Sequence, residues 1–150
     1  MTVYPTRALS IRQPWCHRIL YEGKDVENRT WRANFRGPFL IHASKKPEGI
    51  AECRALGAPL GGIVGMAEII DCVDTMESDW FFGPYGFVLA NVQALEFIPC
   101  KGALGFFRPE INIDDLKPLQ GRHVFVEPEK KLKKVVSLIS CHQHRRASDD

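Results

Sequence analysis

Apolar residues along the chain fall in short runs separated by glycine and proline, and their spacing predicts several small elements. Apolar positions at helical spacing after Pro14 predict a short helix over residues 13–23. A second short helix is predicted over residues 47–56, where Gly57 provides a stop. Residues 24–36 are polar with interleaved aromatic side chains, and this pattern predicts a loop or an irregular strand.

Extended segments are predicted wherever an apolar run is short and bounded by turn residues. The predicted strands cover residues 38–43, 61–72, 85–99 and 123–126. Gly65 interrupts the second run, which indicates a bulge or a close approach of another group to the backbone. Short strands combined with short helices predict an α+β domain built on a small β-barrel.

Composition narrows the class of protein without indicating a function. The chain has 150 residues, of which 45% are hydrophobic and 25% charged, as in one ordinary globular domain. No run reaches the roughly 18 apolar residues that a membrane-spanning helix needs. The N-terminus lacks a secretory pattern, so we expect a cytoplasmic protein with no membrane partner. Nothing in the sequence predicts the oligomeric state.

The cysteines and histidines do not form a pattern typical of metal sites. Five cysteines are widely spaced without a CxxC pair, so neither a disulfide framework nor a four-cysteine zinc site is predicted. Cys141, His142 and His144 cluster near the C-terminus, but no second half-site accompanies them. We therefore expect no metal, no cofactor and no disulfide partner.

Charge is distributed unevenly along the chain, although the net charge is only +2. Residues 1–46 hold nine Lys or Arg and three acids, whereas residues 47–100 hold one base and eight acids. Such asymmetry is typical of a protein with a polyanionic partner. The alternative is that the segments interleave in space and their charges cancel.

The segment from Ser10 to Lys46 combines basic and aromatic residues. Lys24, Glu27 and Arg29 follow the predicted helix at close spacing, and tryptophans flank them on both sides. Lys and Arg can bind phosphates, while aromatic rings can stack on unpaired bases. The same pattern also fits a surface loop held by salt bridges, with Trp15 and Trp31 in the core.

The run LSIRQPWCHRILYEGKDVENRTWRANFRGPFLIHASKK resembles the ASCH domain, named for activating-signal cointegrator homology. The resemblance rests on a QPW-type helix, a GxKxxExR motif beginning at Gly23, and the RGPFLIHA strand. Later segments, GGIVG from Gly61, WFFGPYGF from Trp80 and KGALGFF from Lys101, are similar to those of small bacterial single-domain members. The resemblance covers about residues 8–126.

This resemblance implies a PUA-like β-barrel with a cleft beside the helix, and a role connected with RNA. It divides the chain into a lead at 1–7, an ASCH domain at 8–127, and a basic tail at 128–150 that forms a weak helix or is disordered. One branch of small bacterial members hydrolyses N4-acetylcytidine with Lys, Thr and Glu. Lys24 matches the Lys of that branch, whereas Glu27 stands at the position of its Thr. Other single-domain relatives are linked to cleavage of single-stranded RNA.

The candidate site residues come from the motif and its flanks. His42 alternates with Leu40 on a predicted strand and is expected to be an interior histidine. Candidates for catalysis are Lys24, Glu27 and Tyr85. Candidates for binding nucleic acid or ligand are Arg12, Gln13, Trp15, Arg29, Trp31, Arg36, Ser44, Lys45 and Trp80.

Three functions follow as hypotheses. The first is a module that binds single-stranded RNA or a modified nucleobase or nucleoside in a basic cleft. The second is a hydrolase that uses Lys24 with Glu27, either as a metal-independent ribonuclease for single strands or as an N4-acetylcytidine-type amidohydrolase. The third is a protein-interaction domain, which leaves the basic and aromatic segment without a purpose.

Overall fold

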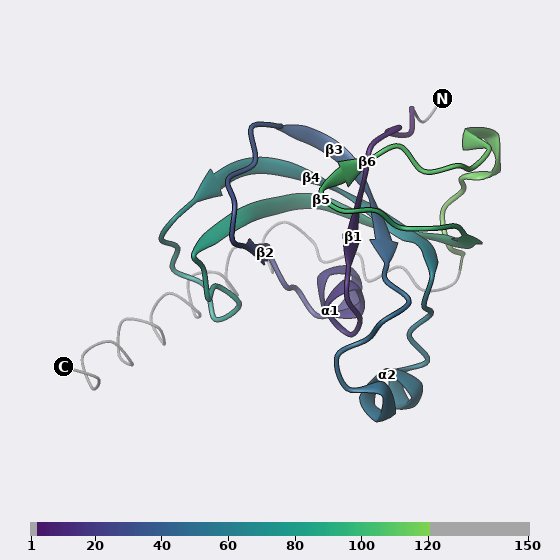
Figure 1. Ribbon diagram of the computed structural model, residues 1–150, viewed down its shortest axis with the longest axis horizontal. Coiled ribbons are helices and arrows are strands. Elements are labelled where there is room, and N and C mark those ends of the chain that lie inside the picture. The colour runs from purple at the N-terminus through teal and green to yellow at the C-terminus, as the bar shows by residue number, and fades with distance from the viewer. Residues whose placement is uncertain (1–2, 121–150) are drawn as a thin grey trace.

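The longest apolar runs of the chain form the centre of one mixed sheet (Figure 1). The computed structural model describes residues 3–120. The strands lie in the order β2-β5-β4-β3-β1-β6, and only the β1–β3 pair is parallel. The elements are β1 (Ala8–Ile11), α1 (Trp15–Tyr21), β2 (Val26–Arg29), β3 (Gly37–Ala43), α2 (Ile50–Leu56), β4 (Gly62–Val73), β5 (Tyr85–Pro99), β6 (Phe106–Phe107) and the short 3₁₀ turn η1 (Ile113–Asp115).

The sheet curls because its two longest strands, β4 and β5, are paired with several register shifts. Each shift inserts an irregularity that bends the strands and increases their twist. Figure 1 shows the long strands curving over α1, with α2 farther from the sheet. This curled half-barrel with two α-helices in the described residues confirms the predicted α+β class and is consistent with a PUA-like barrel.

The core lies between the concave face of the sheet and α1. Phe39 and Ile41 from β3 and Phe87 from β5 are fully buried, and α1 adds Cys16 and Ile19. Burying a large apolar side chain contributes about 1.5–3 kcal/mol, so α1 is held mainly by this face. The start of α1 is thereby fixed against the sheet, beside the segment that carries the candidate motif.

Two glycines behave as the sequence predicts. A Cβ atom on Gly65 would lie 2.5 Å from a methyl group of Leu20 and 2.8 Å from the carbonyl oxygen of Gln93. Only glycine therefore allows α1 to approach β4 so closely, and a register shift adjoins the same position. Gly57 ends α2 in the left-handed conformation, with φ of 65°, as expected of a glycine stop.

Other predictions differ from the structure in the bounds of the two helices and in the short strands of the sheet. The helix predicted over 13–23 is shorter, and the helix predicted over 47–56 begins only at Ile50. Residues 24–36, which the sequence predicts as a loop or irregular strand, contain the regular strand β2, which pairs with β5. Strands β1 and β6 have no counterpart in the prediction.

The predicted strand at 123–126, the basic tail and the Cys141–His144 cluster lie outside the described residues. Within residues 3–120, no helix is long and apolar enough to cross a membrane.

Candidate functional site

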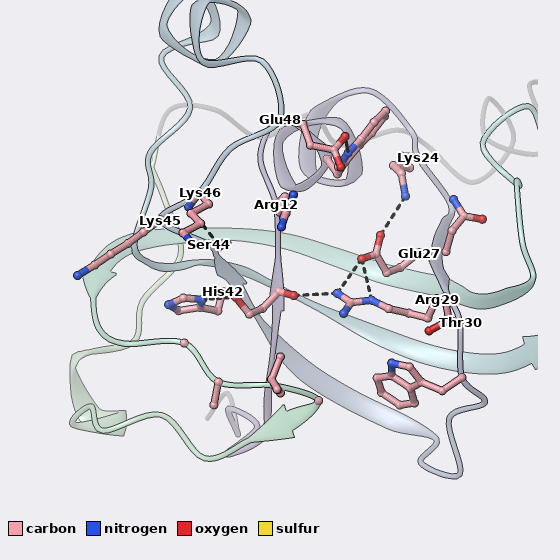
Figure 2. A pocket seen from close by; sticks show the side chains of 18 of the residues that line it. Arg12, Lys24, Glu27, Arg29, Thr30, His42, Ser44, Lys45, Lys46 and Glu48 are labelled. Carbon is pink, nitrogen blue, oxygen red and sulfur yellow. Dashed lines mark hydrogen bonds and ion pairs between the residues drawn. The ribbon is translucent and has the colours of Figure 1, made fainter.

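A cleft of about 950 Å³ opens between the start of α1, strand β2, the end of β3 and the loop at residues 101–105 (Figure 2). These segments are distant in sequence, but the parallel pairing of β1 with β3 puts the end of β1, which leads into α1, beside the end of β3. The charged side chains that line the cleft are Arg12, Lys24, Arg29, Lys45, Lys46, Lys101, Glu27 and Glu48. Six cationic side chains against two carboxylates make this surface basic.

Lys24, Glu27 and Arg29 form a connected ion-pair network at one side of the cleft (Figure 2). The Lys24 ammonium lies 3.3 Å from one oxygen of Glu27 and also donates to the Val26 carbonyl. The other Glu27 oxygen accepts from Nε and Nη2 of Arg29 at 3.2 and 2.9 Å. Alternation along β2 places Glu27 and Arg29 on one face, and Lys24 reaches that face from the preceding turn.

Burial changes the chemistry of Lys24. Its side chain is only 3% exposed, and this burial lowers the pKa of the amine from its ordinary value of 10.5. The negative charge of Glu27 raises the pKa but does not outweigh the burial. The neutral, nucleophilic form of Lys24 is therefore easier to reach than that of a surface lysine.

Ser10 and His42 form a second hydrogen-bonded group in the same cleft. Arg29 connects the two groups, because its Nη2 donates to the Ser10 carbonyl at 2.7 Å. The Ser10 hydroxyl lies 2.9 Å from Nδ1 of His42, and Nε2 of His42 lies 2.9 Å from the Cys100 carbonyl. His42 is 1% exposed, as its position on the predicted strand indicates.

A further set of cations at the cleft is exposed and unpaired. Within the described part of the chain, none of these four side chains forms an ion pair with a carboxylate: Arg12, Lys45, Lys46 and Lys101. Elsewhere, acids from the middle of the chain do pair with bases of the N-terminal third, in the pairs Arg18–Glu52, Arg32–Asp74 and Arg36–Asp71. The charges therefore interleave in part, and four cations without an ion pair lie together at the cleft.

Aromatic and apolar side chains complete the lining. Trp15 and Trp31 are half-buried, and the Trp15 indole donates to Glu48 at 2.8 Å. Trp31 packs edge-on against the core residue Phe87 at a centroid distance of 5.1 Å, so its position is fixed. Phe82 and Leu104 are 77% and 99% exposed, and both line the cleft.

Comparison with known proteins places this chain in a family. The family model described as the ASCH domain matches residues 9–99, which is more than half of the chain. The chain belongs to the ASCH domain family. The resemblance carried by the GxKxxExR motif and its flanks is thus confirmed.

A curated human protein, Activating signal cointegrator 1, is 28% identical over an alignment of 122 residues. The alignment covers 63% of this chain and 20% of the human protein, so the chain spans about a fifth of that relative.

The structure brings most of the sequence-predicted residues of this ASCH domain to the cleft. Those in the lining are Arg12, Trp15, Lys24, Glu27, Arg29, Trp31, Ser44 and Lys45. Both tryptophans contact the core as well as the cleft, so neither of the two alternatives drawn from the sequence excludes the other. The roles of all eight lining residues in binding or catalysis stay predictions.

Four predicted site residues do not line the cleft. Gln13 is buried, with its amide nitrogen donating to the Pro59 carbonyl and its amide oxygen accepting from the backbone of His17. Arg36 donates to the carbonyl of Ala33 and pairs with Asp71 of β4.

The other two of these residues come from the region before and at the start of β5. Trp80 offers its backbone carbonyl to Asn28, while its indole is not part of the lining. The Tyr85 ring packs on the core and lies 4.7 Å from the guanidinium of Arg32. Tyr85 is thus absent from the cleft lining, and its catalytic role stays a prediction.

The sequence interpretation overlooked several lining residues. Ser10 pairs with His42 across strands, and Phe82, Lys101 and Leu104 come from loops far from the motif. An aromatic residue beside Gly83-Pro84 and a lysine beside Gly102 were available signals of exposed loops.

Within residues 3–120, no group of three or more His, Cys, Asp or Glu is placed to hold a metal ion.

Proposed function

We propose that this ASCH domain binds single-stranded RNA, including strands that carry a modified base, in the basic cleft. The observation that carries the proposal is the division of the cleft into two parts. Lys24, Glu27 and Arg29 are already paired with one another, whereas the four cations named above have no carboxylate partner among the described residues. Unpaired cations at a cleft attract phosphates and release their counterions on binding.

The paired part of the cleft supports recognition of a base. The Glu27 carboxylate lines the cleft and can accept hydrogen bonds from a base. Trp15 and Trp31 present ring faces or edges nearby, and stacking of a base on an aromatic ring contributes about 1–3 kcal/mol. A base in a duplex cannot reach such a recessed group, which favours a single strand.

The exposed apolar residues support a strand rather than an isolated nucleoside. Phe82 and Leu104 project from two different loops that border the cleft. A single base in the cleft leaves such residues in contact with water, whereas flanking bases of a strand cover them. We therefore expect the affinity for an oligonucleotide to exceed that for a nucleoside.

A hydrolase is the second candidate, and the burial of Lys24 favours it. The buried amine beside Glu27 has a lowered pKa, as amines that act as bases or nucleophiles do. Such an amine could assist metal-independent cleavage of single-stranded RNA or hydrolysis of an acylated nucleobase. Because Glu27 stands where one branch of relatives uses a threonine, the hydroxyl required by that chemistry is missing from the motif.

A gel of end-labelled single-stranded RNA separates these candidates. The wild type and Lys24→Ala are incubated with the RNA in chelator at low salt, and Lys117→Ala, far from the cleft lining, is the control. We expect intact RNA with retarded mobility for the wild type and control, and weaker retardation for Lys24→Ala. Cleavage by the wild type and control that Lys24→Ala abolishes would establish the hydrolase instead. Unretarded, intact RNA with all three proteins would refute both.

A further inference from the structure

Ser10 and His42 have the geometry of a nucleophile and its general base. They are paired residues on the neighbouring parallel strands β1 and β3, and the Ser10 hydroxyl lies 2.9 Å from Nδ1 of His42. On the far side of the ring, Nε2 lies 2.9 Å from the Cys100 carbonyl oxygen. A hydroxyl bonded to an imidazole that a third group orients is the arrangement used in nucleophilic catalysis.

The partners of the imidazole determine which nitrogen carries the proton. A carbonyl oxygen only accepts hydrogen bonds, so Nε2 of His42 must be the donor to Cys100. In the neutral ring Nδ1 is then unprotonated and accepts the hydrogen bond from Ser10. Nδ1 is therefore in the state that a general base requires.

The surroundings give Ser10 access to a substrate and to a cation. Ser10 is half-buried, and both Ser10 and His42 line the cleft, although His42 is almost fully buried. Arg29 lines the same cleft and contacts the Ser10 carbonyl through Nη2. Its Nη1 has no hydrogen-bond partner among the described residues, so it can donate to an oxyanion.

Gly102 leaves room for this pair. A Cβ atom at this position would lie 2.7 Å from Cε1 of His42 and 3.0 Å from both Nδ1 and the Ser10 hydroxyl. Any side chain on Gly102 would displace the imidazole or the hydroxyl. The loop at 101–105 therefore lies against the pair without separating the hydroxyl from the imidazole.

We propose that Ser10 is the nucleophile of an acyl-ester hydrolase in this cleft, with His42 as its general base. The Ser10 oxygen attacks the ester carbonyl carbon, and the hydroxyl proton passes to Nδ1 of His42. The bond from that carbon to the leaving oxygen breaks, and the imidazolium returns the proton to this oxygen. Water then hydrolyses the Ser10 ester by the same route, which releases the carboxylic acid and restores both side chains.

The cationic rim indicates the class of ester. Its unpaired cations favour an ester whose alcohol part carries phosphate, such as a nucleotide acylated on its ribose. This preference for an anion rests on the proposed function, whereas the hydrolytic step itself requires only Ser10, His42 and Arg29.

The test uses a fluorophosphonate, which reacts covalently with activated serines, and p-nitrophenyl acetate as an ester. Ser10→Ala is compared with Thr75→Ala, because Thr75 is an exposed hydroxyl residue outside the cleft lining. We expect one adduct per wild-type chain, mapped to Ser10 by mass spectrometry, and the same adduct in Thr75→Ala. Ser10→Ala and His42→Gln should lose the adduct and at least about 100-fold of the ester hydrolysis.

Melting temperature and RNA retardation are measured on each variant to separate a loss of activity from a loss of fold or of binding. Wild-type protein that forms no adduct, or an adduct that persists in Ser10→Ala, would overturn the proposal and leave RNA binding untouched. If an acetylated nucleoside and its 5′-phosphate are hydrolysed at equal rates, only the preference for an anionic substrate is wrong. The assignment of Ser10 as the nucleophile is not affected by that result.

Discussion

Replacing Glu27 with alanine is expected to lower the free energy of unfolding by about 3 kcal/mol. The Glu27 side chain is 9% exposed and contacts two cations, of which Lys24 is 3% exposed. Removing the carboxylate leaves both cations without their counter-charge, and an uncompensated buried charge is costly. The loss is limited because Lys24 can release its proton, as burial already lowers the pKa of this amine.

Urea unfolding followed by circular dichroism measures this loss. Glu52→Ala is the matched control, because Glu52 also pairs with an arginine but is 52% exposed. That control should cost no more than about 1 kcal/mol. A Glu27→Ala variant as stable as Glu52→Ala would show that the network does not stabilise the fold.

Neutralising the exposed lysines of the cleft is expected to reduce RNA affinity roughly 100-fold at 0.1 M salt. Each phosphate contact on a single strand contributes about 1 kcal/mol of counterion release at this salt concentration. The triple variant Lys45→Gln, Lys46→Gln and Lys101→Gln removes three such contacts. Among the described residues, these three lysines form no ion pair with a carboxylate, so the fold does not depend on their charge. Its melting temperature should therefore stay close to that of the wild type.

The salt dependence of binding gives a second signature of the same contacts. Four phosphate contacts predict a slope of log affinity against log salt of about −3 for the wild type, and about −1 for the triple variant. Fluorescence anisotropy of a labelled strand measures both, and Lys117→Gln serves as the control because Lys117 pairs with Glu96. Equal slopes for wild type and triple variant would place the phosphates elsewhere on the protein.

The spacing of apolar residues predicted those helices and strands whose own side chains form the core. Strand β3 and helix α1 lie where apolar spacing puts them, because their side chains form the core. Strand β1 has four residues and β6 has two, and both exist because distant strands offer hydrogen-bond partners. No window of sequence contains that information, so such edge strands escape prediction.

The candidate site divides in the same way. Close spacing in the sequence is sufficient to predict that Lys24, Glu27 and Arg29 lie together. Strand β2, whose alternation puts Glu27 and Arg29 on one face, was not predicted. Gln13 and Tyr85 are adjacent to functional segments, yet their side chains point into packing interactions that spacing does not predict.

The three tryptophans of the chain offer the most direct test of binding in the cleft. Trp15 and Trp31 line the cleft, whereas Trp80 does not, and each indole N–H gives its own NMR signal. When a short single-stranded RNA is titrated into ¹⁵N-labelled protein, the indole signals of Trp15 and Trp31 should shift and that of Trp80 should stay in place. A shift of the Trp80 signal with unchanged Trp15 and Trp31 signals would contradict RNA binding in this cleft.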